Sequence, residues 1–301
     1  MSRKWIVLLL PITRLELPGW GWCVTRIGKM GYEHDALWVD EPARVIRGKW
    51  HGYLMKLDMT NWSARHTYFL GRYYELHLQL LLNQLVKSGD RVIDIGANIG
   101  MITLHAAHLV GADGQVESFE PNPVCQKQIQ EVIEMNGIIQ IKLHPFGLSD
   151  AEAELQLKQN HTHTGIGTFA EMDDAEVVVS TTALVKKGDD VFADDTDRTP
   201  ILIKIDVEGF ELRALKGLEQ TITRWKCDVV MEMNNNHLQR AGTSTREVGE
   251  FMVGLGYRAF DVRIKKKLIR YGLDLVAVDS IEGLDDCRDV LWTTKPGDPL
   301  C

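Results

Sequence analysis

From residue 91 onward, the chain alternates short, continuous apolar segments with segments of helical spacing. The apolar segments cover residues 91–95, 116–120, 138–143, 201–206, 228–233, 257–262 and 290–294. Alternation of this kind predicts a mostly parallel sheet with helices on both faces, a doubly wound α/β fold. Continuous apolar strands fit such a sheet because both of their faces are buried. Its ligands should bind at the carboxyl ends of the strands.

The region before residue 91 has two parts. Leu70, Tyr74, Leu78, Leu81, Leu82 and Leu85 recur at spacings of three and four, which predicts one amphipathic helix over about 68–87. Residues 1–65 are irregular and interrupted by proline and glycine. We therefore expect an N-terminal extension, 1–65, that packs on a main domain formed by 66–301.

Charge and cysteine usage limit the partners and the compartment. The net charge of −8 argues against nucleic acid, because phosphate binding needs a basic field. The five cysteines form no C-x-x-C pair and are odd in number, which predicts reduced thiols in the cytoplasm rather than disulfides or a zinc site. The apolar run over residues 5–10 is broken by Pro11 and is too short to span a bilayer, so we expect no membrane span.

A glycine loop follows the first predicted strand, with the sequence DIGANIG over residues 94–100. Glycine lets the backbone approach a ligand closely at the start of the next helix. The loop is not G-x-G-x-x-G and taken alone is equally compatible with a tight turn. Glu120 ends the second strand, twenty residues after Gly100, where a carboxylate can accept hydrogen bonds from ribose hydroxyls. Together they predict an adenosine site, for NAD or for S-adenosylmethionine.

The ends of the later strands carry further polar residues. Leu148 with Ser149 or Asp150 provides an apolar slot and a polar edge for adenine, although a plain turn fits the spacing nearly as well. Asp206 and Glu208 lie two apart and point to the same side, so they repel unless a cation or amine lies between them. Glu211 fits a role at the start of the next helix.

The fifth strand ends in Glu232, a third carboxylate at the same edge of the sheet, and His237 follows it. Imidazole accepts a proton near neutral pH, which makes His237 a candidate general base. A surface histidine in a polar loop is the alternative.

Four motifs in this order, DIGANIG (94–100), FEPNP (119–123), GLSD (147–150) and KIDVEGFE (204–211), resemble the FkbM-type methyltransferase family. FLGRYYE (69–75) resembles the helix that leads into the domain in that family. The resemblance covers residues 50–235. It implies the class I methyltransferase sheet, which is Rossmann-like, with seven strands and the last one antiparallel. It also implies S-adenosylmethionine as methyl donor and usually a hydroxyl on a sugar or secondary metabolite as acceptor.

The resemblance also implies a role for each motif residue. Asp94, Gly96, Ala97, Asn98 and Gly100 would form the loop around the methionine part, Glu120 would hold the ribose with Asn122 beside it, and Leu148 with Ser149 would flank adenine. Asp206 and Glu208 would lie between donor and acceptor. The polar loop over residues 160–169 would close over the acceptor. Its His161 and His163 are spaced as metal ligands can be, although a solvated loop fits them better.

For the mechanism we expect Asp206, Glu232 or His237 to act as base, with Glu208 also in the catalytic group. Carboxylates that bind a divalent metal are the alternative, which is not favoured because the sequence does not spell out the ligands. An NAD-dependent oxidoreductase is a rival function, against which the missing third glycine counts. A non-catalytic cofactor-binding scaffold is another, against which the three acids at strand ends count.

Overall fold

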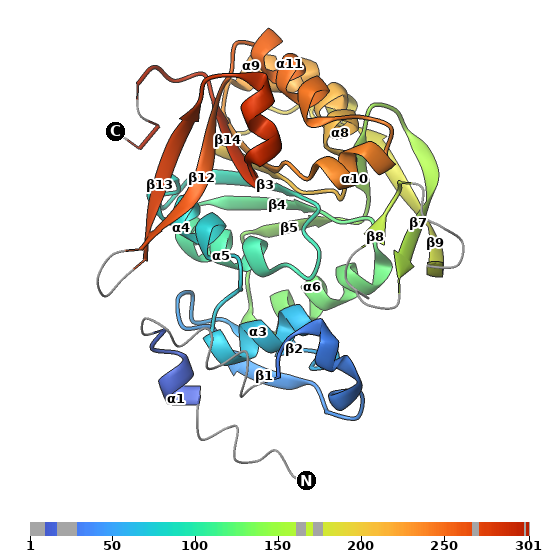
Figure 1. Ribbon diagram of the computed structural model, residues 1–301, viewed down its shortest axis with the longest axis vertical. Helices are drawn as coiled ribbons and strands as arrows, with labels where there is room; N and C mark the ends of the chain where they lie inside the picture. Colours follow the sequence, from blue (N-terminus) through green and yellow to red (C-terminus); the bar gives the residue numbers. More distant parts are fainter. Residues whose placement is uncertain are drawn as a thin grey trace.

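The computed structural model describes residues 10–16, 29–160, 167–170, 177–266, 271–297 and 299–300. An eight-stranded sheet lies at its centre, in the order β13-β12-β14-β11-β10-β3-β4-β5 (Figure 1). The strands are β3 (Arg91–Ile95), β4 (Gln115–Phe119), β5 (Ile141–His144), β10 (Leu202–Ile205), β11 (Asp228–Glu232), β12 (Arg258–Lys266), β13 (Tyr271–Val278) and β14 (Asp289–Thr293). From β5 to β11 all neighbours pair in parallel, whereas β14 is antiparallel to both of its neighbours. The predicted fold class and the antiparallel last strand are confirmed.

The sheet has one strand more than the seven predicted. β12 continues beyond residue 262 to Lys266, and β13 pairs with it antiparallel along its whole length. This hairpin forms the edge of the sheet, and most residues of β13 are only half-buried. Gly272 and Asp274 interrupt the first half of β13 and leave only residues 275–278 as an apolar run, which is shorter than the runs that identify the central strands.

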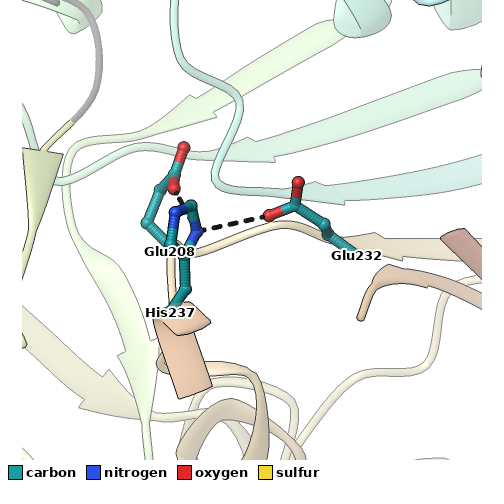
Figure 2. A group of neighbouring side chains, drawn as sticks. All are labelled: Glu208, Glu232 and His237. Atoms are coloured by element: carbon teal, nitrogen blue, oxygen red, sulfur yellow. Dashed lines mark ion pairs between the residues drawn. The ribbon is translucent and has the colours of Figure 1, made fainter. Parts of the chain in front are cut away.

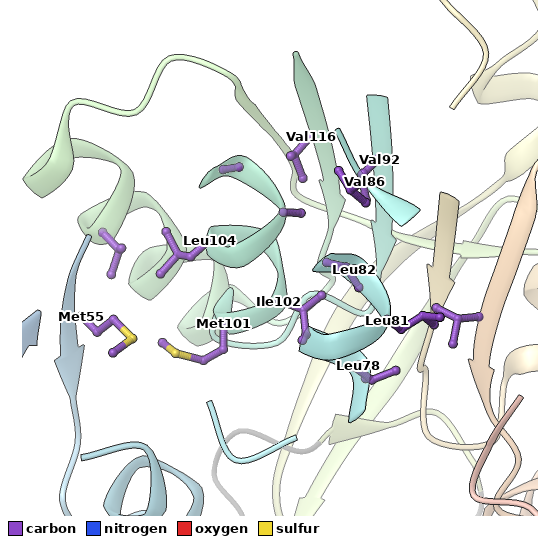
Figure 3. Close-up of a cluster of buried hydrophobic side chains, with 14 of the residues drawn as sticks. Met55, Leu78, Leu81, Leu82, Val86, Val92, Met101, Ile102, Leu104 and Val116 are labelled. Atoms are coloured by element: carbon purple, nitrogen blue, oxygen red, sulfur yellow. The ribbon is translucent and has the colours of Figure 1, made fainter. Parts of the chain in front are cut away.

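Helices cover both faces of the sheet. One face carries α4 (Leu76–Leu85), α5 (Met101–Val110) and α6 (Pro123–Asn136), and the other carries α8 (Glu211–Gly217), α9 (Glu219–Trp225), α10 (Asn235–Arg240) and α11 (Thr245–Gly254). Val92 points into the first core and its neighbour Ile93 into the second. Figure 3 shows the first core, where Leu78, Leu81 and Leu82 of α4 lie beside Ile102 of α5. Burial on both sides explains why the central strands are apolar throughout.

The single helix predicted over residues 68–87 is wrong, because two helices occupy this region. α3 (Trp62–Leu70) ends at Gly71, which has φ 71° and donates its N–H to the carbonyl of Thr67. Such a left-handed cap ends a helix, and glycine adopts it without steric cost. α4 begins five residues later, at Leu76. Tyr73, Tyr74 and Glu75 therefore lie in a break between helices.

The N-terminal part packs against the first core. It contains α1 (Leu10–Thr13), the 3₁₀ helix η2 (Tyr32–Leu37), β1 (Arg44–Arg47), β2 (Leu54–Leu57) and α3. Met30, Trp38 and Met55 are buried in the same cluster as the side chains of α4 and α5. The predicted boundary at residue 65 falls inside α3, and the division into extension and domain stays a prediction. None of the helices in the described ranges is both long and apolar enough to cross a membrane.

A second sheet, which sequence analysis does not predict, is inserted between β5 and β10. Its strands are β6 (Gly147–Ser149), β7 (Ala153–Asn160), β8 (Gly167–Thr168) and β9 (Val177–Lys187), in the order β6-β9-β7-β8. The short α7 (Gly188–Val191) follows it, and the 3₁₀ helix η3 (Ile281–Asp286) precedes β14. Figure 1 shows β7, β8 and β9 beside the main sheet, next to α6 and α10.

Candidate functional site

Two adjoining pockets open at the carboxyl ends of the central strands. The first encloses about 630 Å³, open solvent at its mouth included, and is lined by Ile95, Gly96, Asn98, Glu120, Pro121, Gly147, Leu148, Leu157, Gly167, Phe169, Asp206, Val207, Glu208 and Phe210. The second is lined by Trp62, Tyr73, Tyr74, Glu75, Asn98, Thr168, Ala170, Asp206, Glu208, Glu232, His237, Arg240 and Arg288. Asn98, Asp206 and Glu208 line both pockets, so they mark where the contents of the two would meet.

The glycine loop forms one wall of the first pocket. Gly96 has φ 76°, and a Cβ built on it would lie 1.9 Å from the carbonyl oxygen of Asp206. Asn98 also has a positive φ, 51°, a conformation that asparagine tolerates better than most residues. Gly96 and Ala97 both donate their N–H to the carbonyl of Phe119, which ties the loop to the end of β4. The loop therefore requires glycine at 96 for both conformation and space.

We expect Gly96→Ala to lower the free energy of unfolding by about 2–5 kcal/mol, because a left-handed alanine is strained and its Cβ meets fixed backbone. Gly52→Ala is the matched control, since Gly52 has φ 73° and nothing within 4 Å of the added Cβ. It should lose only the conformational part, about 1–2 kcal/mol. Urea denaturation of both variants measures the difference, and equal losses would contradict the close approach of the two loops.

Glu120 lies at the base of the first pocket with both carboxylate oxygens engaged. Oε2 accepts the N–H of Asn98 at 2.7 Å and Oε1 accepts the N–H of Asn122 at 2.8 Å. Burial raises the pKa of Glu120 to about 7, although these two hydrogen bonds act to lower it. Each carboxylate oxygen keeps a further lone pair, so Glu120 can still accept hydrogen bonds from a ligand.

A buried lysine links the two strands beneath the loop. Lys204 of β10 stands opposite Asp94 of β3 in the parallel ladder. Its Nζ donates to the carbonyl of Gly96 at 2.8 Å and lies 3.3 Å from Asp94 Oδ1 and 3.4 Å from Asp206 Oδ2. Burial lowers the pKa of Lys204, but the carboxylates of Asp94, Asp206 and Glu75 raise it above the ordinary value. Lys204 is therefore the cation that compensates Asp94 and Asp206, whereas Glu208 is paired with His237.

Asp206 stands at the junction of the two pockets. Burial raises its pKa well above the ordinary value, Lys204 opposes that rise, and Glu232 and Glu208 add to it. The side chain of Glu75, in the break before α4, is 11% exposed, and burial and the carboxylate of Asp289 raise its pKa. The junction therefore concentrates carboxylates.

Glu208, Glu232 and His237 meet on the side of the second pocket (Figure 2). His237 Nδ1 lies 2.8 Å from Glu208 Oε2 and 3.6 Å from Glu232 Oε2. The neighbouring carboxylates of Glu208 and Glu232 raise the pKa of His237 to about 10, so the imidazole carries a proton at neutral pH when nothing else is bound. In this environment His237 is a poor proton acceptor, which leaves the carboxylates as the better candidates for a base.

Glu211 organises the loop after β10, as its position at a helix start predicts. Its Oε1 accepts the N–H groups of Val207 and Gly209, both at 3.1 Å. The side chain is almost fully buried, and burial raises the pKa of Glu211 to about 7. It holds the backbone that carries Glu208.

A family model described as the methyltransferase FkbM domain matches residues 94–259, more than half of the chain. The chain belongs to the FkbM methyltransferase family. This confirms the predicted resemblance, and membership of a methyltransferase family supports an enzyme.

Relatives of this FkbM-family chain are distant. It is 27% identical over 145 residues to the hexuronic acid methyltransferase AglP of Haloferax volcanii, covering 48% of this chain and 56% of that protein. It is 26% identical over 159 residues to methyltransferase 1 of Beauveria bassiana, covering 47% and 64%. The chain thus spans less than two thirds of either relative. A solved methyltransferase FkbM from Methylobacillus flagellatus is 16% identical, with a TM-score of 0.46 over 91% of this chain and 60% of that one.

The predicted site residues divide into two groups. Gly96, Asn98, Glu120, Leu148, Asp206, Glu208, Glu232 and His237 line the pockets. Asp94, Ala97, Gly100, Asn122 and Ser149 lie behind the lining. Asp94 accepts from the hydroxyl of Thr103 at 2.6 Å, and Asn122 caps α6. Their assignment as cofactor contacts stays a prediction. His161 and His163 lie outside the described residues.

The sequence does not predict five residues that line the second pocket, Tyr73, Tyr74, Glu75, Arg240 and Arg288. Tyr73 and Glu75 stand in the sequence only as part of the FLGRYYE motif, and Tyr74 also belongs to the apolar spacing that predicts a helix. The break between α3 and α4 places all three in this pocket. Arg240 and Arg288 carried no motif at all. Arg288 pairs with Glu75 at 3.3 Å, which links the break before α4 to the start of β14.

Proposed function

We propose that the chain transfers a methyl group from S-adenosylmethionine to a hydroxyl of a sugar or secondary metabolite. The observation that carries this is the junction of the two pockets at Asn98, Asp206 and Glu208. The first pocket would hold the donor and the second the acceptor. Holding two reactants at one junction is itself a large part of catalysis, on the order of 7–11 kcal/mol in favourable models.

Three residues of the first pocket suit an adenosyl ligand. Glu120 would accept hydrogen bonds from the ribose hydroxyls, Leu148 would give an apolar surface for adenine, and Gly96 adds only backbone to the lining. When bound, S-adenosylmethionine supplies a methyl group on a positively charged sulfur, which leaves as a neutral thioether. The carboxylates of Asp206 and Glu208 provide the negative field that favours such a cation.

The second pocket has the character of a carbohydrate site. The rings of Trp62 and Tyr74 lie 4.9 Å apart between centroids, and Arg240 and Arg288 line the same pocket. Aromatic faces pack against the apolar faces of sugars, while charged groups hydrogen-bond to the hydroxyls. The Haloferax volcanii relative acts, by its name, on a hexuronic acid. An acidic sugar is accordingly the acceptor we would test first.

Asp206 is the residue we assign as general base. It lines both pockets, so its carboxylate lies where an acceptor hydroxyl and the donor would meet. A base placed within reach of the reacting proton contributes about 10²–10⁴-fold to the rate. The hydroxyl proton passes to the Asp206 carboxylate as the acceptor oxygen takes the methyl group.

Calorimetric titration with S-adenosylhomocysteine tests the donor site. We expect binding on the order of micromolar at pH 8 and no binding of NAD. Because Glu120 takes up a proton below pH 7 and then loses acceptor capacity, affinity should fall about tenfold between pH 8 and pH 6. Glu120→Gln should bind weakly at both pH values and lose this dependence.

The other outcomes discriminate between the rivals. Binding of NAD alone would replace the proposal with an oxidoreductase. Binding of S-adenosylhomocysteine without methylation of any uronic acid, neutral sugar or phenol in a panel would favour a non-catalytic scaffold.

A further inference from the structure

The cluster of Glu208, Glu232 and His237 combines ligands from three separate elements. Glu208 lies in the loop after β10, Glu232 ends β11, and His237 belongs to α10. One ligand atom of each lies within 4.8 Å of the other two, and each side chain is partly exposed to the second pocket. Figure 2 shows both carboxylates directed at the imidazole of His237.

These spacings match a metal coordination shell. In a six-coordinate site with bonds of about 2.1–2.2 Å, neighbouring ligands lie about 3 Å apart and opposite ligands about 4.3 Å apart. The Nδ1 to carboxylate separations are 2.8 Å and 3.6 Å. Small side-chain rotations therefore suffice to close the three atoms around one ion. We propose that Glu208, Glu232 and His237 bind a single divalent cation.

An ordinary ion pair does not account for the cluster as well. His237 Nδ1 is buried, yet it makes no well-directed hydrogen bond to either carboxylate. The pair formed by His144 and Glu117 has the same 2.8 Å spacing, but there the ring nitrogen makes a proper hydrogen bond and Arg91 also binds Glu117. An unaligned nitrogen between two carboxylate oxygens is the arrangement that a cation would complete.

The backbone of Glu208 adopts a left-handed conformation that neighbouring contacts hold in place. Its φ of 53° is strained for a glutamate, and strain of this kind collects at functional sites. Thr168 donates its hydroxyl to the Glu208 carbonyl at 2.8 Å. Gly209 packs so closely on α10 that a Cβ there would lie 2.4 Å from the carbonyl oxygen of His237. These contacts fix the carboxylate beside the imidazole.

Imidazole with two carboxylates suits Mn²⁺ or Zn²⁺ better than Mg²⁺, which prefers oxygen ligands alone. Three protein ligands leave coordination positions open toward the second pocket. If the proposed function holds, an acceptor hydroxyl occupies one of them, and the ion lowers the pKa of that hydroxyl so that Asp206 removes its proton more easily. The binding of the ion itself does not depend on the proposed function.

Titration with Mn²⁺, followed by electron paramagnetic resonance at pH 8, tests the site without donor or acceptor. We expect one Mn²⁺ per chain, displaced by Zn²⁺ more readily than by Mg²⁺, with a nitrogen coupling from the imidazole in the spin-echo spectrum. His237→Gln should remove the coupling, and Glu208→Gln, Glu232→Gln and His237→Gln should each weaken binding at least tenfold. His144→Gln, which removes the hydrogen bond between His144 and Glu117, should leave binding unchanged.

No binding of Mn²⁺ or Zn²⁺ by the wild-type protein, or binding that the three variants leave intact, would overturn the proposal. The nitrogen coupling is measured on the wild-type protein, so poor folding of a variant does not remove the test. A failed titration with S-adenosylhomocysteine would count against the methyltransferase function only, because the Mn²⁺ measurement needs no adenosyl ligand.

Discussion

Asp206→Asn should lower kcat/KM for methyl transfer by about 10²–10⁴-fold, the usual contribution of a placed general base. Asparagine has nearly the shape of aspartate but cannot take up the hydroxyl proton. The fold should survive, because burial, Glu232 and Glu208 all disfavour the charge on Asp206, and Asp94 remains as a carboxylate partner for Lys204. The loss of kcat/KM is measured by the release of S-adenosylhomocysteine in the presence of an acceptor from the panel of uronic acids, neutral sugars and phenols. Thermal unfolding of the variant checks that the fold is intact.

The matched control for this substitution is Asp274→Asn. Asp274 lies on the edge strand β13, 3.9 Å from the ammonium of Lys265, and lines neither pocket. It should keep wild-type turnover. Full activity of Asp206→Asn would remove Asp206 from the mechanism, whereas a loss confined to the affinity for S-adenosylhomocysteine would make it a binding residue instead.

The donor side of the site is predictable because it is local in the chain. Gly96 and Asn98 follow β3 directly, and Glu120 follows the next strand. Parallel strands bring their carboxyl ends to one edge, so spacing along the sequence is enough to place such residues together. Pro121 and Phe210 also line the first pocket, but the sequence does not predict this because they contribute to the shape of the pocket and carry no charge.

The acceptor side depends on contacts between distant segments. Glu75 and Arg288 lie 213 positions apart and meet only because β14 is inserted antiparallel beside β11. The sequence pattern does not reveal that a helix ends at Gly71, because Leu70, Tyr74 and Leu78 keep a helical spacing across the break between α3 and α4. The sequence identifies His237 as a candidate base but does not show that Glu208 and Glu232 lie beside it. Because these two glutamates raise the pKa of His237, it is better suited to act as a cation or a metal ligand than as a base.

Lys204→Met should strongly lower the stability of the fold. Lys204 is 5% exposed and Asp94 is fully buried, so loss of the ammonium leaves a buried carboxylate without its cation. Breaking a buried pair in this way costs about 3–5 kcal/mol. For a chain of this size, that corresponds to a fall in Tm on the order of 10 °C, measurable by calorimetry.

The double variant Lys204→Met with Asp94→Asn separates charge from packing. Asparagine removes the uncompensated charge and still accepts the hydroxyl of Thr103, so part of the lost Tm should return. Lys56→Met serves as control, because the pair of Lys56 with Glu131 is closer, at 2.8 Å, but lies at the surface and should contribute little. A wild-type Tm for Lys204→Met would mean that Asp94 is compensated without the lysine. Absence of rescue in the double variant would assign the loss to the hydrogen bond that Lys204 donates to Gly96, and thus to the glycine loop itself.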